Sequence, residues 1–154
     1  MIRPATLNDL EALLAIEQRS FAGDRISRRS FRHLLTQGHA LTLLDEDAGM
    51  VRGYIMLLFR SGLRSARAYS IATDTRWRGR GVAAGLLAAA ESAARARDCT
   101  AIRLEIRKDN LASLTLFSER RYHCTGTRPR YYQDGMDAFR FAKRLSPVST
   151  LARH

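Results

Sequence analysis

The chain has 154 residues, of which 45% are hydrophobic and 27% charged, proportions typical of a globular domain with a substantial core. No apolar run approaches the roughly 20 residues of a membrane span, and the two cysteines lack the spacing of a metal site. The formal net charge is +11, carried by 24 arginines and 2 lysines spread along the chain. Because no nucleic-acid motif accompanies this charge, we expect attraction for anionic groups and no specific nucleic acid.

The first part of the chain predicts two helices. Thr6-x-x-Asp9 resembles a capping box, and apolar residues then recur at helical spacing, which predicts a helix from Leu7 to Ser20. A second, shorter helix is predicted to begin after Ser27. The segment between them, Phe21 to Ile26, is predicted to be a loop.

Strands and helices then alternate less regularly. Apolar and β-branched runs predict strands at Ala40–Leu44, Val51–Phe59, Arg67–Thr73 and Ala101–Ile106. Helical spacing predicts helices at Val82–Arg97 and Asn110–Arg120. Tyr122–Gly126 leads into a final pair of strands that turns at Asp134-Gly135, and the tail from Ser146 to His154 is expected to be frayed.

The predicted element order is β-α-α-β-β-β-α-β-α-β-β. An antiparallel first half combined with a βαβ centre predicts the α/β class, with a central mixed sheet of about seven strands flanked by about four helices. The length predicts one domain, residues 1–145. The N-terminus lacks the apolar core of a signal peptide, so we expect a cytoplasmic protein, monomer or homodimer.

A glycine turn joins a strand to a helix in the middle of the chain. The apolar run Tyr69–Thr73 is followed by Arg78-Gly79-Arg80-Gly81-Val82-Ala83, which opens the long helix. Glycines let the backbone approach a ligand closely, and the first turn of a helix presents free N–H groups and partial positive charge. Arg76, Arg78 and Arg80 add formal charge. This order predicts a pyrophosphate-binding loop; the alternative is an ordinary glycine-rich turn with solvated arginines.

Two other phosphate loops fit less well. A P-loop ends in Gly-Lys-Ser/Thr, and neither Lys nor Ser/Thr follows Gly81. Gly79-x-Gly81-x-x-Ala84, with Glu105 further on, fits the relaxed dinucleotide fingerprint. However, residues 74–78 separate the strand from the first glycine, and only about fifty residues follow Glu105, too few for the second half of that sheet.

Motifs in order from Ile2 to Leu145 resemble the GNAT N-acetyltransferases. Arg78-x-x-Gly81-x-Ala83 matches the family's acetyl-CoA loop, Q/R-x-x-G-x-G/A. Leu104-Glu105-Ile106-Arg107, followed by Asn110, Ala112 and Leu116-Phe117, resembles its L-E-V-R-x-x-N-x-x-A-x-x-L-Y segment. Tyr131 to Ala138 resembles the Y-Y-x-D-G-x-D-A hairpin of protein N-terminal acetyltransferases, including the RimI type, and Ile2-Arg3-Pro4-Ala5 and Ile16-Glu17-x-x-x-Phe21 fit the family's opening.

The resemblance implies the GNAT fold, in which the strands corresponding to Arg67–Thr73 and Ala101–Ile106 splay apart around acetyl-CoA, the co-substrate. It implies transfer of acetyl to a primary amine, and the tyrosine hairpin implies a protein or peptide α-amine. A small-molecule amine acetyltransferase and a non-catalytic acetyl-CoA-binding module are the alternatives. The implied cofactor-binding residues are Ile71, Ala72, Thr73, Arg78, Gly79, Arg80, Gly81, Val82, Ala83, Asn110 and Phe117.

Glu105 is the candidate general base, since the attacked amine must be neutral and is mostly protonated at pH 7. We expect it in an apolar setting between Leu104 and Ile106, where burial would raise its pKa; the alternative is that it pairs with an arginine. Backbone N–H groups of Ile71–Thr73 are implied as oxyanion donors. No metal is expected.

The leaving thiolate is where the chain departs from the family. Phe117 stands where RimI-like enzymes usually carry a tyrosine acid, so either the thiolate leaves unaided or another group serves. Tyr122, Cys124 and Tyr132 are the weaker candidates for that group, and Phe117 is expected to pack against the pantetheine arm. Asn110 is expected to contact the pantetheine region, cap the following helix, or both.

The acceptor-binding residues implied by the resemblance are Phe21, Tyr131 and Tyr132. Because adjacent strand residues face opposite ways, at most one of the two tyrosines is expected to face the site, and cross-strand packing is the alternative role. Gly23-Asp24-Arg25 replaces the family's usual Pro-containing apolar loop beside Phe21, which leaves the acceptor open.

Overall fold

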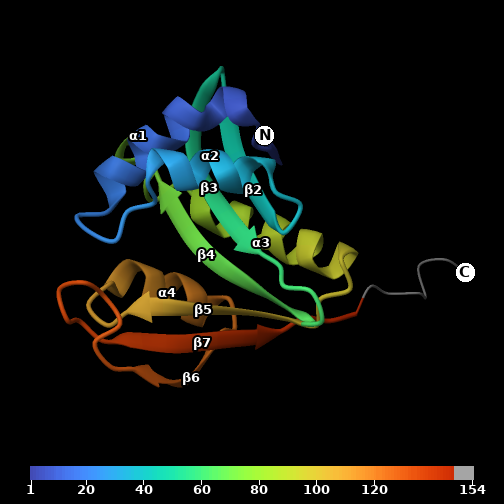
Figure 1. The fold of residues 1–154 in the computed structure, drawn as a ribbon, viewed down its shortest axis with the longest axis vertical. Coiled ribbons are helices and arrows are strands. Elements are labelled where there is room, and N and C mark those ends of the chain that lie inside the picture. Colours follow the sequence, from blue (N-terminus) through green and yellow to red (C-terminus); the bar gives the residue numbers. More distant parts are fainter. Residues whose placement is uncertain (148–154) are drawn as a thin grey trace, which may run out of the picture.

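The computed structural model of the chain describes residues 1–147, and most of the predicted tail lies outside the described residues. A seven-stranded sheet runs through the described part (Figure 1), in the order β1-β2-β3-β4-β5-β7-β6. The strands are β1 (Ile2–Pro4), β2 (Ala40–Asp47), β3 (Met50–Leu58), β4 (Ser65–Thr73), β5 (Ala101–Arg107), β6 (His123–Arg128) and β7 (Ala138–Arg144). The helices are α1 (Leu10–Ser20), α2 (Arg28–Thr36), α3 (Val82–Ala96) and α4 (Leu111–Glu119). The predicted element order and mixed sheet are confirmed.

Helix ends follow local chemistry. A 3-10 turn at Leu7–Asp9 precedes α1, and the Asp9 carboxylate accepts a hydrogen bond from the backbone N–H of Thr6 at 2.8 Å. Ser27 caps α2 by accepting from the N–H of Ser30 at 3.1 Å. The predicted helix starts therefore lie within a few residues of the observed ones.

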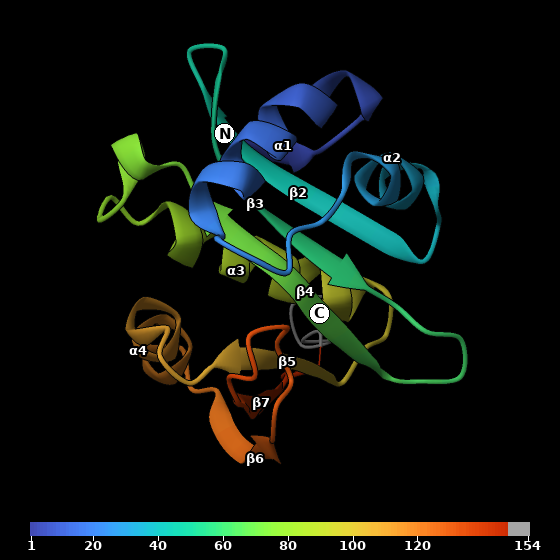
Figure 2. The ribbon, with the colours of Figure 1, turned by 60° about the vertical axis from the view of Figure 1, so that its left-hand side comes forward.

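Two layers of helices enclose the sheet (Figure 2). Residues of α1 and α2 form one core with β2–β4, centred on Leu13, Phe31 and Tyr54, all fully buried. Residues of α3 and α4 form the second core on the other face, with Leu86 and Phe117 at its centre. Alternation along β5 turns its apolar residues towards this second core and its charged residues to the opposite face.

The final hairpin differs from the prediction. The turn at Asp134-Gly135 is present, but residues 129–137 form a loop between β6 and β7, so both tyrosines lie outside the strands. Pro129 has no N–H for the ladder, and Arg130 has φ +49°, which breaks the extended backbone. The Asp137 carboxylate accepts from the N–H of Arg130 at 2.9 Å and closes the loop.

Candidate active site

The sheet opens at the junction of β4 and β5. These parallel strands pair only at Ser65–Ala101, Ala66–Ile102 and Arg67–Arg103, and then diverge (Figure 1). The predicted splaying is therefore confirmed. Within residues 1–147 no strand lies beside this edge of β4 beyond Arg67, so its outward N–H groups are available to a ligand, whereas the Thr73 carbonyl accepts from Arg78 Nε at 3.4 Å.

A β-bulge interrupts the pairing of β4 with β3 and changes the direction of this part of β4. Met56 pairs with Ser70 and Leu57 with Ala68, which leaves Tyr69 as the extra residue. Further along, the N–H of Asp74 bonds the carbonyl of Arg52 at 2.7 Å. Because N–H directions alternate in an antiparallel ladder, the N–H groups of Ile71 and Thr73 point towards the gap, whereas that of Ala72 points to β3.

The glycine turn lies at the same end of β4. Gly79 and Gly81 adopt φ +76° and +78°, the left-handed region that other residues rarely enter, and both are exposed. Gly81 is the N-cap of α3, and no side chain caps the helix there. Ser27 and Asn110, by contrast, fill that role at α2 and α4. The first N–H groups of α3 are therefore available to bind an anion, as phosphates of acetyl-CoA require.

Asp74 anchors the turn, and this changes the role of one arginine. The buried Asp74 carboxylate accepts from Arg19 at 2.7 Å and from the backbone N–H of Arg76 at 3.1 Å. Burial pushes the pKa of Asp74 upwards, but the hydrogen bonds from Arg76 outweigh it and lower that pKa. Because Arg76 is paired, the free positive charge of the loop comes from Arg78 and Arg80, both exposed.

Asn110 and Phe117 have structural roles in α4. The Asn110 side-chain oxygen accepts from the N–H of Ser113 at 3.1 Å, so the predicted cap is confirmed. Phe117 is fully buried and packs edge to face on Tyr122, with ring centres 5.0 Å apart. It offers no surface to a pantetheine arm, so the expected cofactor contact is corrected to a core contact. Helical spacing turns this residue into the core, and sequence alone could not decide between the two faces.

Two of the three candidate acids are excluded by position. The buried hydroxyl of Tyr122 donates to Glu91 at 2.8 Å, within the second core. Cys124 lies on β6, with β7 between it and β5, roughly 10 Å from the gap. Tyr132 remains, next to Glu105 in the loop; burial, the neighbouring Tyr131 and Glu105 raise its pKa to about 12.

Glu105 lies on the charged face of β5, not in the apolar setting that was expected. Leu104 and Ile106 point into the opposite core, because strand residues alternate. The carboxylate is only 9% exposed and has Arg67 Nε at 3.4 Å and Arg128 at 3.6 Å. Neither contact is a hydrogen bond: the first leaves Arg67 Nε without a partner, and the second is too long. Glu105 therefore has two arginine neighbours, and its oxygens keep accepting capacity.

Two arginines beside Glu105, Arg67 and Arg128, were not predicted from the sequence. Arg67 could have been found from the strand register, because it pairs with Arg103, two residues before Glu105 on the parallel neighbour. Arg128 ends β6, two strands away from the gap, and no local signal in the sequence connects it to Glu105.

Both tyrosines of the hairpin belong to the β6–β7 loop: Tyr131 bonds Arg67, which contacts Glu105, and Tyr132 lies close enough for the charge of Glu105 to raise its pKa. Their rings pack edge to face, 5.0 Å apart. The Tyr131 hydroxyl accepts from Arg67 at 2.6 Å, and Arg128 lies 5.2 Å from its ring centre. The expectation that at most one of them faces the site assumed that both belong to a strand, and that assumption is wrong.

The other wall is the loop after α1, which begins at the half-buried Phe21. Glu17, buried in α1, holds this loop by accepting from the N–H of Ile26 at 2.8 Å, and it also accepts from the Tyr54 hydroxyl. Burial, then the adjacent carboxylate, raises the pKa of Tyr54 well above its usual value. At the loop's tip, Asp24 accepts from the N–H of Gln133 at 3.3 Å. The two loops therefore meet over the charged face of β5.

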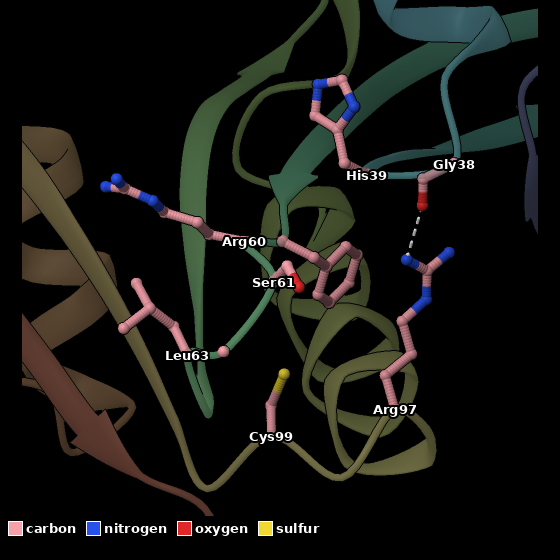
Figure 3. Close-up of a pocket in the computed structure, with 9 residues that line it drawn as sticks. Gly38, His39, Arg60, Ser61, Leu63, Arg97 and Cys99 are labelled. Atoms are coloured by element: carbon pink, nitrogen blue, oxygen red, sulfur yellow. Dashed lines mark hydrogen bonds between the residues drawn. The ribbon is translucent and has the colours of Figure 1, made fainter.

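A hollow of about 470 Å³ lies at the start of β4, at the end away from the glycine turn, where three loops meet (Figure 3). Arg97 donates to the Gly38 carbonyl there at 2.9 Å and stacks 4.1 Å from the ring centre of Phe59. Burial raises the pKa of the Cys99 thiol. No carboxylate of the described residues lines this hollow, and His39 is the imidazole of its lining.

The fold and the glycine turn indicate one class of protein, and comparison with known families and structures identifies the same class. The family model described as Acetyltransferase (GNAT) family matches residues 8–122, so the chain belongs to the GNAT acetyltransferase family, whose enzymes use acetyl-CoA. The chain is accordingly an N-acetyltransferase. No curated protein matches the sequence. Within residues 1–147 no group of three or more His, Cys, Asp or Glu side chains could hold a metal ion, and no helix is long and apolar enough to cross a membrane.

Solved structures share the fold over nearly the whole chain. Ard1 from Thermoplasma volcanium is 26% identical, with a TM-score of 0.87, over 95% of this chain and 97% of that one. The ribosomal-protein-alanine N-acetyltransferase from Brucella melitensis is 26% identical, with a TM-score of 0.82, over 94% and 99%. The ribosomal-protein-S18-alanine N-acetyltransferase from Escherichia coli has a TM-score of 0.86 over 97% and 96%, and at 24% identity it shows the fold alone.

Proposed function

We propose that this N-acetyltransferase acetylates the α-amine of a protein or peptide, with Glu105 as its general base. One observation carries the proposal: Glu105 and the tyrosine pair lie under two loops that touch at Asp24 and Gln133, beside the opening of β4 and β5. The aromatic rings and backbone groups of these loops are the kind of surface that contacts an extended peptide end. The similarity to ribosomal-protein-alanine N-acetyltransferases supports the same class of acceptor.

The residues divide the reaction between them. An incoming ammonium loses a proton to Glu105, directly or through one water, and the neutral nitrogen attacks the acetyl carbonyl carbon. The N–H groups of Ile71 and Thr73 donate to the carbonyl oxygen as negative charge develops on it. The carbon–sulfur bond then breaks, the thiolate leaves, and the nitrogen loses its second proton to the thiolate or to water, which gives the neutral amide. An alkyl thiol ionises near pH 8.5, so its departure does not require an acid.

The environment of Glu105 fits this task. Its two arginine neighbours keep the carboxylate in place without saturating its oxygens with hydrogen bonds. Arg67 is itself held by Tyr131, so the base, its neighbour and the acceptor-binding loop form one contiguous unit. A displaced loop would therefore disturb the base as well as acceptor binding.

A thiol-release assay with a panel of peptides, polyamines and aminoglycosides tests the proposal. We expect acetyl-CoA-dependent turnover on peptides with free α-amines and none on the same peptides when N-terminally blocked. Turnover on small amines alone would show a small-molecule acetyltransferase. Thermal stabilisation by acetyl-CoA without turnover on any amine would show a non-catalytic binding module.

A further inference from the structure

We infer that the acetyl acceptor carries a carboxylate next to its reactive amine, and that Arg103 and Arg140 bind it. This inference rests on the proposed function and specifies its substrate class. A hollow of about 230 Å³ lies beside Glu105, on the charged face of β5, β7 and β6. The lining residues are Arg103, Leu104, Glu105, Thr125, Arg128, Arg140, Phe141 and Ala142.

The charge of this hollow is unbalanced. Three arginines line it, a fourth, Arg67, contacts Glu105 from β4, and Glu105 is the one acid of the lining. Four positive charges against one negative charge leave a local excess of three. Like charges held this close repel one another, and an anion in the hollow relieves that repulsion. An acceptor with a second positive charge would add to it.

Two of the four arginines have no acidic partner. Arg67 and Arg128 both contact Glu105, and Arg107, further along β5, is bound by Asp109 and Asp134. Within residues 1–147, neither Arg103 nor Arg140 lies within 4.0 Å of a carboxylate, although Arg140 pairs with Glu105 in the strand register. Their guanidinium donors are thus available, and a guanidinium matches a carboxylate with two parallel hydrogen bonds.

The spacing also fits an acidic residue beside the amine. Arg103 and Glu105 lie two residues apart on one face of β5, so their Cα atoms are about 7 Å apart. In an extended peptide, about 6–8 Å separate the α-amine from the carboxylate of a second-position Asp or Glu. An amine at Glu105 would therefore place that carboxylate near Arg103, with Arg140 on the neighbouring strand.

Calorimetric binding to the enzyme loaded with CoA tests the inference directly. The probes are peptides beginning Ala-Asp or Ala-Glu, their isosteric Ala-Asn and Ala-Gln counterparts, and free aspartate and glutamate, which separate a peptide source from a free amino acid. We expect the acidic peptides to bind at least about 10-fold more tightly than the amides, the usual scale of a hydrogen bond to a charged group. Equal binding, tighter binding of the amides, or no binding of any probe overturns the inference.

Variants show which side chains produce the binding preference for acidic peptides. In the double variant R103Q/R140Q we expect the preference for acidic peptides to fall to about 2-fold or less. R144Q is the matched control, because Arg144 is exposed on β7 and lies outside the hollow, and it should keep the full preference. A preference that survives in the double variant overturns the inference. Thermal unfolding of each variant shows that the fold is intact.

Turnover of the same peptides separates the two proposals. An acidic preference in binding that depends on Arg103 and Arg140, without acetylation of any peptide, supports the carboxylate site and contradicts the proposed function. Acetylation of all peptides without an acidic preference supports the proposed function and contradicts the carboxylate site.

Discussion

The two arms of the open sheet do different kinds of chemistry. The arm formed by β4 and the start of α3 offers main-chain groups: the N–H groups of Ile71 and Thr73 and the uncapped first turn after Gly81. The arm formed by β5 and the β6–β7 loop offers charged and aromatic side chains around Glu105. On the proposed function, backbone geometry specifies the cofactor side, and side-chain identity specifies the acceptor side. Substitutions should separate the two.

The largest loss of function is expected for a substitution in the arm formed by β4 and the start of α3. Gly81→Asp should abolish acetyl-CoA binding, because it places a negative charge where phosphates approach the N–H groups of α3. Gly81→Ala is the matched control. A Cβ at this position meets no protein atom within 4 Å, so in the free enzyme alanine costs only the strain of φ +78°, about 1–2 kcal/mol of stability. Calorimetric titration with acetyl-CoA measures both, and unchanged affinity in Gly81→Asp would mean that the cofactor lies elsewhere.

The next largest loss of function is expected in the arm formed by β5 and the β6–β7 loop. Glu105→Gln should lower turnover roughly 10²–10⁴-fold, the usual contribution of a positioned general base. Acetyl-CoA affinity should hardly change, because Glu105 lies on the other arm. The defect should shrink as pH rises, since more of the acceptor amine is already neutral there. Near-normal activity at pH 7 would reduce Glu105 to a partner of Arg67 and Arg128. Glu119→Gln, on the exposed end of α4, controls for loss of one negative charge.

Phe117 belongs to neither arm. Its substitution tests whether the stability of the core can be lowered without changing the affinity for acetyl-CoA. Phe117→Ala should destabilise the fold by about 3–5 kcal/mol, because a fully buried ring that packs on Tyr122 is removed. Denaturant unfolding measures the loss. Where the variant is folded, its affinity for acetyl-CoA should stay close to that of the unchanged chain. A stable Phe117→Ala variant with weakened acetyl-CoA binding would restore Phe117 to the cofactor site.

The same contrast explains what the sequence could predict. Element order, the glycine turn and the Asn110 cap follow from local patterns, because strand alternation, positive φ and capping act over a few residues. The face of Glu105 also follows from alternation, because its neighbours Leu104 and Ile106 are the apolar residues that face the core; the expected apolar setting was wrong because it ignored this. The contacts of Glu105 with Arg67 and Arg128 join three strands, and no local pattern encodes them.

The smallest effect is expected at the remaining candidate acid. Tyr132→Phe should change turnover by less than about 3-fold, against the roughly 10²–10⁴-fold contributed by an acid that the reaction requires. The reason is that a leaving thiolate is stable near neutral pH without a proton donor. The pKa of about 12 adds a second criterion: this hydroxyl stays protonated between pH 6 and 10, so it contributes no limb to the pH profile there. Steady-state kinetics across that range measures both quantities. A loss of 10²-fold or more in Tyr132→Phe, with acceptor affinity unchanged, would make Tyr132 the acid in place of the missing tyrosine at position 117. It would then be the one side chain that acts on both arms, since it would contact the acceptor and protonate the sulfur.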